Sequence, residues 1–210
     1  MNNNHVPVML KEVLSFIPKD KKINLIDATF GGGGYSRAIL KDFDIKNLIA
    51  IDRDPISKFF YEELKEDFDN IELFNHKFSK IDEILRDSEH FTEKYDVIIF
   101  DLGVSSNQID NPERGFSFQK DGPLDMKMGS SNLNAFEVIN SFDEKKLADI
   151  FYEFGEEKNS RRIAKNIVIN RTKKYIENTL ELSEIIKKSV PAKHSYKKIH
   201  PATKTFQALR

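Results

Sequence analysis

Short apolar runs and amphipathic segments alternate along the first half of the chain. Runs rich in Ile, Val and Leu are typical of strands buried in a parallel sheet, and they occur at residues 23–27, 48–52, 71–75 and 95–101. Apolar residues recur at helical spacing in the segments 6–17, 35–42, 55–66 and 80–87. This alternation predicts an α/β fold, and the continuous run at 95–101 predicts a strand buried on both faces.

The pattern changes after Asp101. Residues 102–128 contain turn-forming residues throughout and no clear period, which predicts a long, ordered, functional loop. Helical spacing then returns in four segments, at residues 135–139, 145–154, 161–171 and 179–189. Ser141-Phe-Asp-Glu144 predicts a capping box for the second of these helices. Four helices without a strand do not continue a β-α alternation, so we interpret them as an inserted helical domain.

A run of four glycines separates the first predicted strand from the first predicted helix. Strand, glycine loop and helix together are typical of a nucleotide-binding unit, because glycine lets a ligand approach the backbone. The dinucleotide fingerprint fails at its third position, which is Ser36. Asp27, Gly31 and Gly33 match the acid-x-x-x-G-x-G motif of S-adenosylmethionine (SAM) methyltransferases. A plain tight turn is the alternative.

Three predicted strands end in a carboxylate: Asp27, Asp52 and Asp101. Ligands of open α/β sheets bind at the carboxyl ends of the strands. Asp52 lies 21 residues after Gly31, about the interval expected for an acid that binds ribose hydroxyls. Its alternative role, as the cap of the next helix, suits Asp54 better because Asp54 directly precedes a proline.

The composition of the chain limits the classes of protein to which it can belong. The 210 residues include no cysteine, and no apolar run is long enough to span a membrane. We expect a cytoplasmic protein without a signal peptide. The five histidines are scattered without ligand spacing, so no metal site is predicted.

The charge is unevenly distributed. Residues 158–210 hold 14 Lys and Arg against 3 Glu, a net charge of +11, whereas the preceding residues carry −12. A basic segment of this kind indicates either a polyanion partner or a solvated helical surface. The candidate phosphate contacts are Arg161, Arg162, Lys165, Lys173, Lys174 and the segment His194–Lys198 with Tyr196. In the long loop, Phe116 and Phe118 are candidates for stacking on a base, with a core role expected for at least one.

Several long motifs resemble one family. They are Asp-Ala-Thr-Phe-Gly-Gly-Gly-Gly-Tyr-Ser, Ala-Ile-Asp-Arg-Asp-Pro, Asp-Leu-Gly-Val-Ser-Ser-x-Gln, Glu-Arg-Gly-Phe-Ser-Phe, Asp-Gly-Pro-Leu-Asp-Met-Lys-Met, Tyr-x-Glu-Phe-Gly-Glu-Glu and His-Pro-Ala-Thr-Lys-Thr-Phe-Gln-Ala-Leu-Arg. The chain resembles the bacterial ribosomal RNA small subunit methyltransferase H (MraW-like) family from His5 to Arg210. This resemblance implies a class I SAM-dependent, Rossmann-like fold with a helical insertion, and methylation of cytosine N4 in the decoding region of 16S rRNA.

The resemblance also implies a set of site residues and domain boundaries. The residues implied to contact SAM are Gly33, Gly34, Tyr35, Asp52, Phe78, Asp101 and Gln108. A core position is the alternative for Phe78. We expect a SAM-binding domain over 1–108, a helical rRNA-recognition insertion over 109–198, and a return to the methyltransferase domain over 199–210.

The chain departs from the family pattern in three respects. Tyr35 replaces the usual His, and Lys204 replaces the usual Arg. Family members are about half as long again and continue beyond the last motif. We therefore expect a sheet that is incomplete on its C-terminal side, with exposed apolar surface on the fourth strand that favours self-association or a homodimer. An inactive remnant that retains partial SAM or RNA binding is the alternative function.

The expected mechanism depends on how the amino group of the target cytosine is positioned. An acceptor on the N4–H of cytosine would localise its lone pair, and Asp101 or carbonyls of the 102–105 loop are the candidates. Asp101 binding the methionine amino group is the alternative. The target base must leave its stack to reach the cofactor. A nicotinamide oxidoreductase is disfavoured, because the third glycine and a hydride-transfer acid–base pair are missing.

Overall fold

The computed structural model describes residues 6–92, 94–129, 133–191 and 199–210. The chain forms two compact units, Met1–Ser105 and Ser106–Arg210, which are treated separately below. His5 and the segment His194–Lys198 lie outside the described residues. The domain boundaries expected from the resemblance stay predictions.

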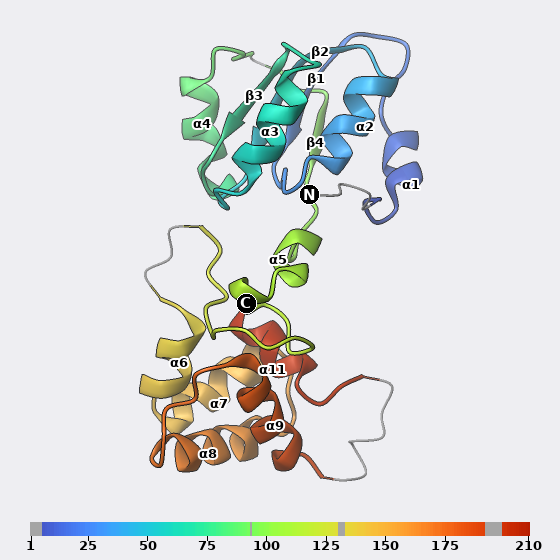
Figure 1. Ribbon diagram of the computed structural model, residues 1–210. Coiled ribbons are helices and arrows are strands. Elements are labelled where there is room, and N and C mark those ends of the chain that lie inside the picture. Colours follow the sequence, from blue (N-terminus) through green and yellow to red (C-terminus); the bar gives the residue numbers. More distant parts are fainter. Residues whose placement is uncertain (1–5, 93, 130–132, 192–198) are drawn as a thin grey trace. The chain divides into compact units, whose positions relative to one another are not determined.

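A parallel four-stranded sheet forms the centre of the first unit (Figure 1). Its strands are β1 (Ile23–Asp27), β2 (Ile45–Ile51), β3 (Ile71–Phe74) and β4 (Val97–Ile99). The spatial order is β3-β2-β1-β4, so the chain adds two strands on one side of β1 and then crosses to the other side. This reversal is the topological switch point beside which α/β sheets bind ligands. The predicted Rossmann-like α/β fold is thereby confirmed.

Helices cover the two faces of this sheet unequally. The first face packs against α1 (Leu10–Ser15), α2 (Gly34–Asp42) and α3 (Ser57–Lys65), with fully buried side chains such as Leu25, Leu48 and Phe60. The second face packs against α4 (Ile81–Asp87), which follows the 3-10 helix η1 (Phe78–Lys80). Alternation along the strands sends neighbours to opposite faces, so Leu25 joins the first cluster and Ile26 the second.

The strand β4 departs from expectation in length and burial. It has three residues rather than seven, and Ile98 is 49% exposed, so the prediction of burial on both faces is wrong. The reason is its edge position: β4 pairs only with β1 among the described strands, and its face turned towards α4 is left uncovered. The related prediction of exposed apolar surface on the fourth strand is confirmed by Ile98, and Phe100, which follows the strand, is 50% exposed.

The second unit is helical within its described residues. Its elements are α5 (Ser106–Asp110), η2 (Pro112–Arg114), α6 (Ala135–Ser141), α7 (Glu144–Glu153), α8 (Ser160–Arg171), α9 (Thr179–Ser189) and α11 (Thr203–Leu209). Helix α8 packs against α7 and α9, and α11 packs against α7. The core contains Phe151, Ile167 and Phe206, which are fully buried.

Two local expectations for this unit are corrected. The predicted irregular loop contains α5 and η2, because Asn111 accepts a hydrogen bond from Glu113 N and so starts η2. The capping box predicted at Ser141 is absent, and Asp143 caps α7 through Lys146 N. A true capping box precedes α6, where Asn134 and Glu137 exchange hydrogen bonds.

Neither a membrane-spanning helix nor a metal-ligand cluster occurs in the described part of the chain. No described helix combines the length and the apolar character needed to cross a bilayer. No group of three or more His, Asp and Glu side chains is arranged to hold a metal ion within residues 6–92, 94–129, 133–191 and 199–210.

Candidate cofactor site

The glycine loop joins β1 to α2 and needs glycine at defined positions. Gly31 and Gly33 have φ angles of +54° and +72°, in the left-handed region that L side chains rarely adopt. A Cβ atom on Gly33 would lie 2.8 Å from Cζ of Phe30. Gly33 is also the N-cap of α2, and Gly34 begins the helix, so unpaired N–H groups of its first turn face the loop.

Asp27, at the end of β1, stabilises this loop with both of its carboxylate oxygens. Its side chain is buried, and its two carboxylate oxygens accept hydrogen bonds from Ser36 Oγ at 2.7 Å and Thr29 N at 3.2 Å. Burial raises the pKa of Asp27 to about 6, against the opposing effect of both hydrogen bonds. Asp27 therefore ties the end of β1 to the start of α2.

Asp52, after the end of β2, holds the other side of the loop. One carboxylate oxygen accepts from Gly31 N at 2.7 Å and the other accepts from Asp54 N at 2.8 Å. Burial raises the pKa of Asp52, and these two hydrogen bonds lower it. Asp54 instead accepts from Ile56 N at 3.3 Å, in the turn that leads into α3. Each Asp52 oxygen keeps a lone pair with which it can accept from a ligand hydroxyl.

Asp101 differs from the two other strand-end carboxylates. Its backbone N–H donates to Thr29 Oγ1 at 2.7 Å, which fixes its main chain beside the loop. The residue is exposed, and no group among the described residues bonds its carboxylate. Asp101 is therefore the one carboxylate of the three with both oxygens available to a ligand.

Phe78 lies on η1 and contacts Phe100, which follows β4. The rings meet edge to face, with centroids 5.5 Å apart and an interplanar angle of 81°. Both are about half exposed, at 42% and 50%, so Phe78 does not occupy a core position. The contact of Phe78 with SAM stays a prediction.

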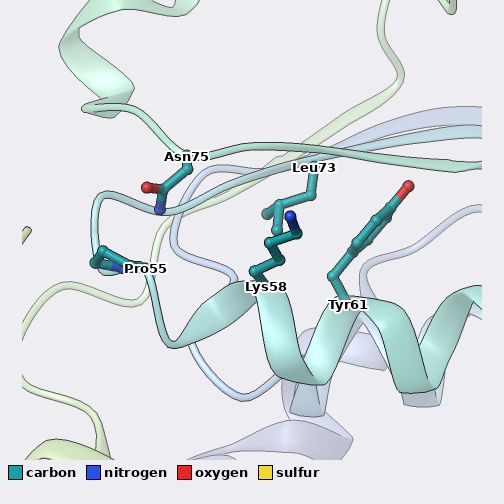
Figure 2. A pocket seen from close by; sticks show the side chains of 5 residues that line it. All are labelled: Pro55, Lys58, Tyr61, Leu73 and Asn75. Atoms are coloured by element: carbon teal, nitrogen blue, oxygen red, sulfur yellow. The ribbon is translucent and has the colours of Figure 1, made fainter.

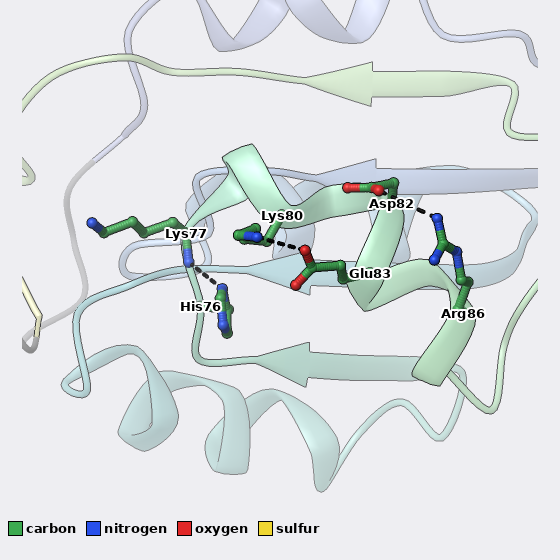
Figure 3. Close-up of polar contacts among 6 residues, drawn as sticks. All are labelled: His76, Lys77, Lys80, Asp82, Glu83 and Arg86. Atoms are coloured by element: carbon green, nitrogen blue, oxygen red, sulfur yellow. Dashed lines mark hydrogen bonds and ion pairs between the residues drawn. The ribbon is translucent and has the colours of Figure 1, made fainter.

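Polar contacts fix the segment that carries Phe78 (Figure 3). Lys77 N donates to Nδ1 of His76 at 3.0 Å, and Lys80 pairs with Glu83. Arg86 and Asp82 form a further ion pair one helical turn apart, at 3.4 Å. These contacts are local to the start of α4 and stabilise its first turns.

Tyr35 makes a contact that the sequence did not predict. Its side chain is 8% exposed, and its hydroxyl donates to the backbone carbonyl of Val8. The hydroxyl therefore binds the segment before α1, although the ring lies in the first turn after the glycine loop. Its predicted contact with the cofactor stays a prediction.

A hollow of about 270 Å³ lies between α3 and the edge strand β3 (Figure 2). Pro55, Lys58 and Tyr61 line it from the α3 side, and Leu73 and Asn75 line it from the β3 side. Asn75 Nδ2 donates to the Asp52 carbonyl at 2.9 Å. The lining includes none of the predicted cofactor residues, so this hollow is not the predicted site.

The first unit thus contains six of the seven predicted cofactor residues, on the glycine loop, α2, η1 and the loops after β2 and β4. Gln108 is buried on α5 in the second unit. Sequence reasoning missed Thr29 and Ser36, which position Asp101 and Asp27. A signal was present for Ser36, because it occupies the place where the dinucleotide fingerprint requires glycine.

Comparison of the sequence with known proteins identifies the family of this chain. A model of the MraW methylase family matches residues 2–210. The chain belongs to the MraW methylase family. It is 48% identical over 209 residues to the ribosomal RNA small subunit methyltransferase H of Ehrlichia canis, covering 98% of this chain and 69% of that protein.

Proteins of the same name from other bacteria are similarly close. The identity is 50% over 209 residues for a Wolbachia sequence, again with 98% and 69% coverage. It is 44% over 215 residues for Rickettsia bellii, covering all of this chain and 67% of that protein. The resemblance inferred from the motifs is therefore confirmed, and the glycine loop is that of a methyltransferase family.

Proposed function

We propose that this MraW methylase transfers a methyl group from SAM to N4 of a cytidine in the decoding region of 16S rRNA. Family membership supports an enzyme of the methyltransferase class, and the similar proteins are named as rRNA small subunit methyltransferases. The observation that carries the proposal is the set of carboxylates at the switch point, of which Asp101 has both oxygens available.

The residues of the first unit fit the cofactor. The positive φ angles of Gly31 and Gly33 keep the loop free of side chains, so a ligand can lie against the backbone. Asp52 is held by two backbone N–H groups in an orientation from which it can accept from ribose hydroxyls. When bound, SAM supplies an electrophilic methyl group.

Asp101 is the residue best placed to act on the ligands. Since no described group competes for its carboxylate, it can accept from the methionine ammonium or from the N4–H of cytosine. Accepting from N4–H would localise the amine lone pair and hold it in line for transfer. The hydrogen bond to Thr29 fixes the main chain of Asp101 and so limits the positions that its carboxylate can reach.

The RNA side of the proposal rests on α8. Arg161, Arg162 and Lys165 share one helical face, and all three are exposed. Within the described residues none of them forms an ion pair, whereas Lys174 pairs with Glu177 at 3.1 Å. We name Arg161, Arg162 and Lys165 the α8 stripe and assign it phosphate binding.

Methyl transfer to small ribosomal subunits tests the proposal directly. Subunits lacking the modification are incubated with the chain and SAM labelled in its methyl group, and the labelled nucleoside is identified after digestion. We expect N4-methylcytidine. A labelled nucleoside of another kind would contradict the base assignment, and binding of SAM without any transfer would favour the inactive alternative.

The Asp101→Asn variant separates the two roles of this carboxylate. SAM affinity is measured by calorimetry and turnover by the same transfer assay. Unchanged affinity with a turnover lowered about 100-fold or more indicates that Asp101 acts on cytosine N4. A collapse of affinity indicates that it binds the methionine ammonium. A variant with wild-type affinity and turnover would exclude both roles.

A further inference from the structure

Outside the cofactor site, two rings of the second unit form a parallel stack near the surface. The imidazole of His200 lies on Phe118, with ring centroids 4.7 Å apart and planes inclined by 20°. Phe118 in turn meets Phe206 edge to face, with ring centroids 5.1 Å apart, and Phe206 is fully buried on α11. The stack is therefore anchored in the core, and its outer member, His200, is exposed.

A second contact fixes the His200 ring. The backbone N–H of Ala202 donates to Nδ1 of His200 at 3.2 Å. Because Nδ1 accepts this bond, the proton of the neutral imidazole is on Nε2. No described residue bonds Nε2, so the exposed edge of the ring carries an N–H donor. The ring is held in place before any ligand arrives.

We propose that the stack of His200 on Phe118 is a platform for one unpaired RNA base. This inference rests on the proposed rRNA substrate and names a contact outside the methyl-transfer site. Proteins bind unpaired bases by stacking them on aromatic rings and by hydrogen bonds to their edges. The outer face of His200 offers the ring surface, and Nε2–H offers the donor.

The charge around the platform suits a nucleic acid. The stack is part of the second unit, where residues 158–210 carry a net charge of +11. This charge attracts the phosphate backbone without sequence preference, whereas the stack would hold a single base. A fixed ring loses little conformational freedom on binding, which favours affinity.

The alternative is a purely structural role, in which His200 only closes the turn before α11. Two variants separate the roles. His200→Asn keeps a side-chain oxygen that can accept from Ala202 N–H, but it removes the ring. His200→Phe keeps a ring that can stack on Phe118, but it removes the acceptor. A platform requires the ring, and a turn requires the acceptor.

Binding is measured by fluorescence anisotropy with a short, mixed-sequence single-stranded RNA at several salt concentrations. We expect His200→Asn to weaken binding about fivefold or more, since stacking of one base contributes ~1–3 kcal/mol. We expect His200→Phe to bind more tightly than His200→Asn, because it keeps the stacking ring and loses only the Nε2–H donor. The salt dependence of His200→Asn should match the wild type, because no cation that neutralises phosphate is lost.

Other results would overturn the platform. Binding by His200→Phe that is as weak as, or weaker than, binding by His200→Asn would assign the effect to the turn, because keeping the ring would then have preserved nothing. Wild-type binding by both variants would remove the platform while leaving the proposed rRNA function in place. A wild-type chain that does not bind this RNA at all would overturn the platform, whereas the transfer assay on small ribosomal subunits would still decide the proposed function.

Discussion

Asp27, Asp52 and Asp101 each follow or end a strand of one sheet, but their carboxylates make different contacts. Asp27 accepts from Ser36 Oγ and Thr29 N, and Asp52 accepts from two backbone N–H groups. The Asp101 carboxylate has no partner among the residues that the structure describes. Two carboxylates therefore shape the loop, and the third is available for chemistry.

The buried carboxyl of Asp27 predicts a specific pH dependence of stability. Its folded pKa of about 6 exceeds the unfolded value of about 3.9, so the folded state binds the proton more tightly. The stability from this group is fully present below the unfolded pKa and is lost as pH rises through about 6. We expect Asp27→Asn to remove up to about 3 kcal/mol of this pH-dependent change.

Urea unfolding of the wild type and Asp27→Asn between about pH 4 and pH 7 measures this effect. The free energy of unfolding of the wild type relative to the variant should fall across that interval and level off above it. A difference that does not vary with pH would show that burial does not raise the pKa of Asp27.

We expect two adjacent glycines, Gly33 and Gly34, to respond differently to replacement by alanine. Gly33→Ala places a Cβ 2.8 Å from the Phe30 ring at a φ of +72°, so we expect a loss of about 1–2 kcal/mol or more. Gly34 is the first residue of α2, where alanine is a good helix former, so Gly34→Ala should be neutral or slightly stabilising. Urea unfolding without cofactor compares the two, and equal losses would contradict the role given to Gly33.

At the scale of elements, Tyr35 links helix α2 to the segment that precedes α1. Its hydroxyl on α2 donates to the Val8 carbonyl, just before α1. Helix α1 has no fully buried residue, and only partly buried side chains such as Leu10, Val13 and Leu14 pack on the core. This hydrogen bond therefore adds to the packing that holds the N-terminal segment.

Tyr35→Phe should loosen this segment without disturbing the sheet. Loss of one hydrogen bond costs about 1 kcal/mol, which corresponds to about fivefold faster tryptic cleavage at Lys11 in α1. Tyr61→Phe is the matched control, because no described residue bonds the Tyr61 hydroxyl. Equal cleavage rates in wild type and Tyr35→Phe would mean that α1 is held by packing alone.

The sequence predicted the long elements well and the short ones poorly. All four strands and the helices α2, α3, α4 and α6–α9 lie where apolar periodicity placed them, within a few residues at each end. Helices α5 and α11 and the 3-10 helices η1 and η2 were missed. Their few residues show no clear period, and η2 depends on the Asn111 cap.

The sequence predicted the residue types of the candidate site, but not the contacts that those residues make. The spacing of Asp27, Gly31 and Gly33 indicated a cofactor loop, and the ends of the strands indicated Asp52 and Asp101. Which carboxylate bonds which N–H depends on the path of the loop, as the contact of Asp52 with Gly31 N shows. Phe116 is fully buried, so it packs in the core as expected for at least one of the two loop aromatics.

At the scale of the whole molecule, charge divides between the two units. Residues 1–105 hold 14 Lys and Arg against 20 Asp and Glu, a net charge of −6. Residues 106–210 hold 19 against 14, a net charge of +5. The second unit is therefore the one expected to attract a polyanion, whereas the first holds the candidate cofactor site.

Neutralising the α8 stripe tests this division. The triple change Arg161→Gln, Arg162→Gln and Lys165→Gln should weaken RNA binding and reduce the slope of log K against log salt by about 2. Lys11, Lys41 and Lys46 are exposed in the first unit, and changing all three to Gln removes equal charge as the control. A control that loses as much affinity as the stripe variant would show only a net-charge effect.

The position of β4 in the sheet also affects the order in which the strands pair during folding. β1 pairs with β2 and β2 with β3 in sequence, whereas β4 returns to β1 across a separation of 72 residues, as in the bond from Asp101 N to Thr29 Oγ1. Contacts between distant residues form late, because a longer loop must close first. During refolding, the amides at the β1–β4 junction should gain protection from hydrogen exchange last, so the switch point matures after the rest of the sheet.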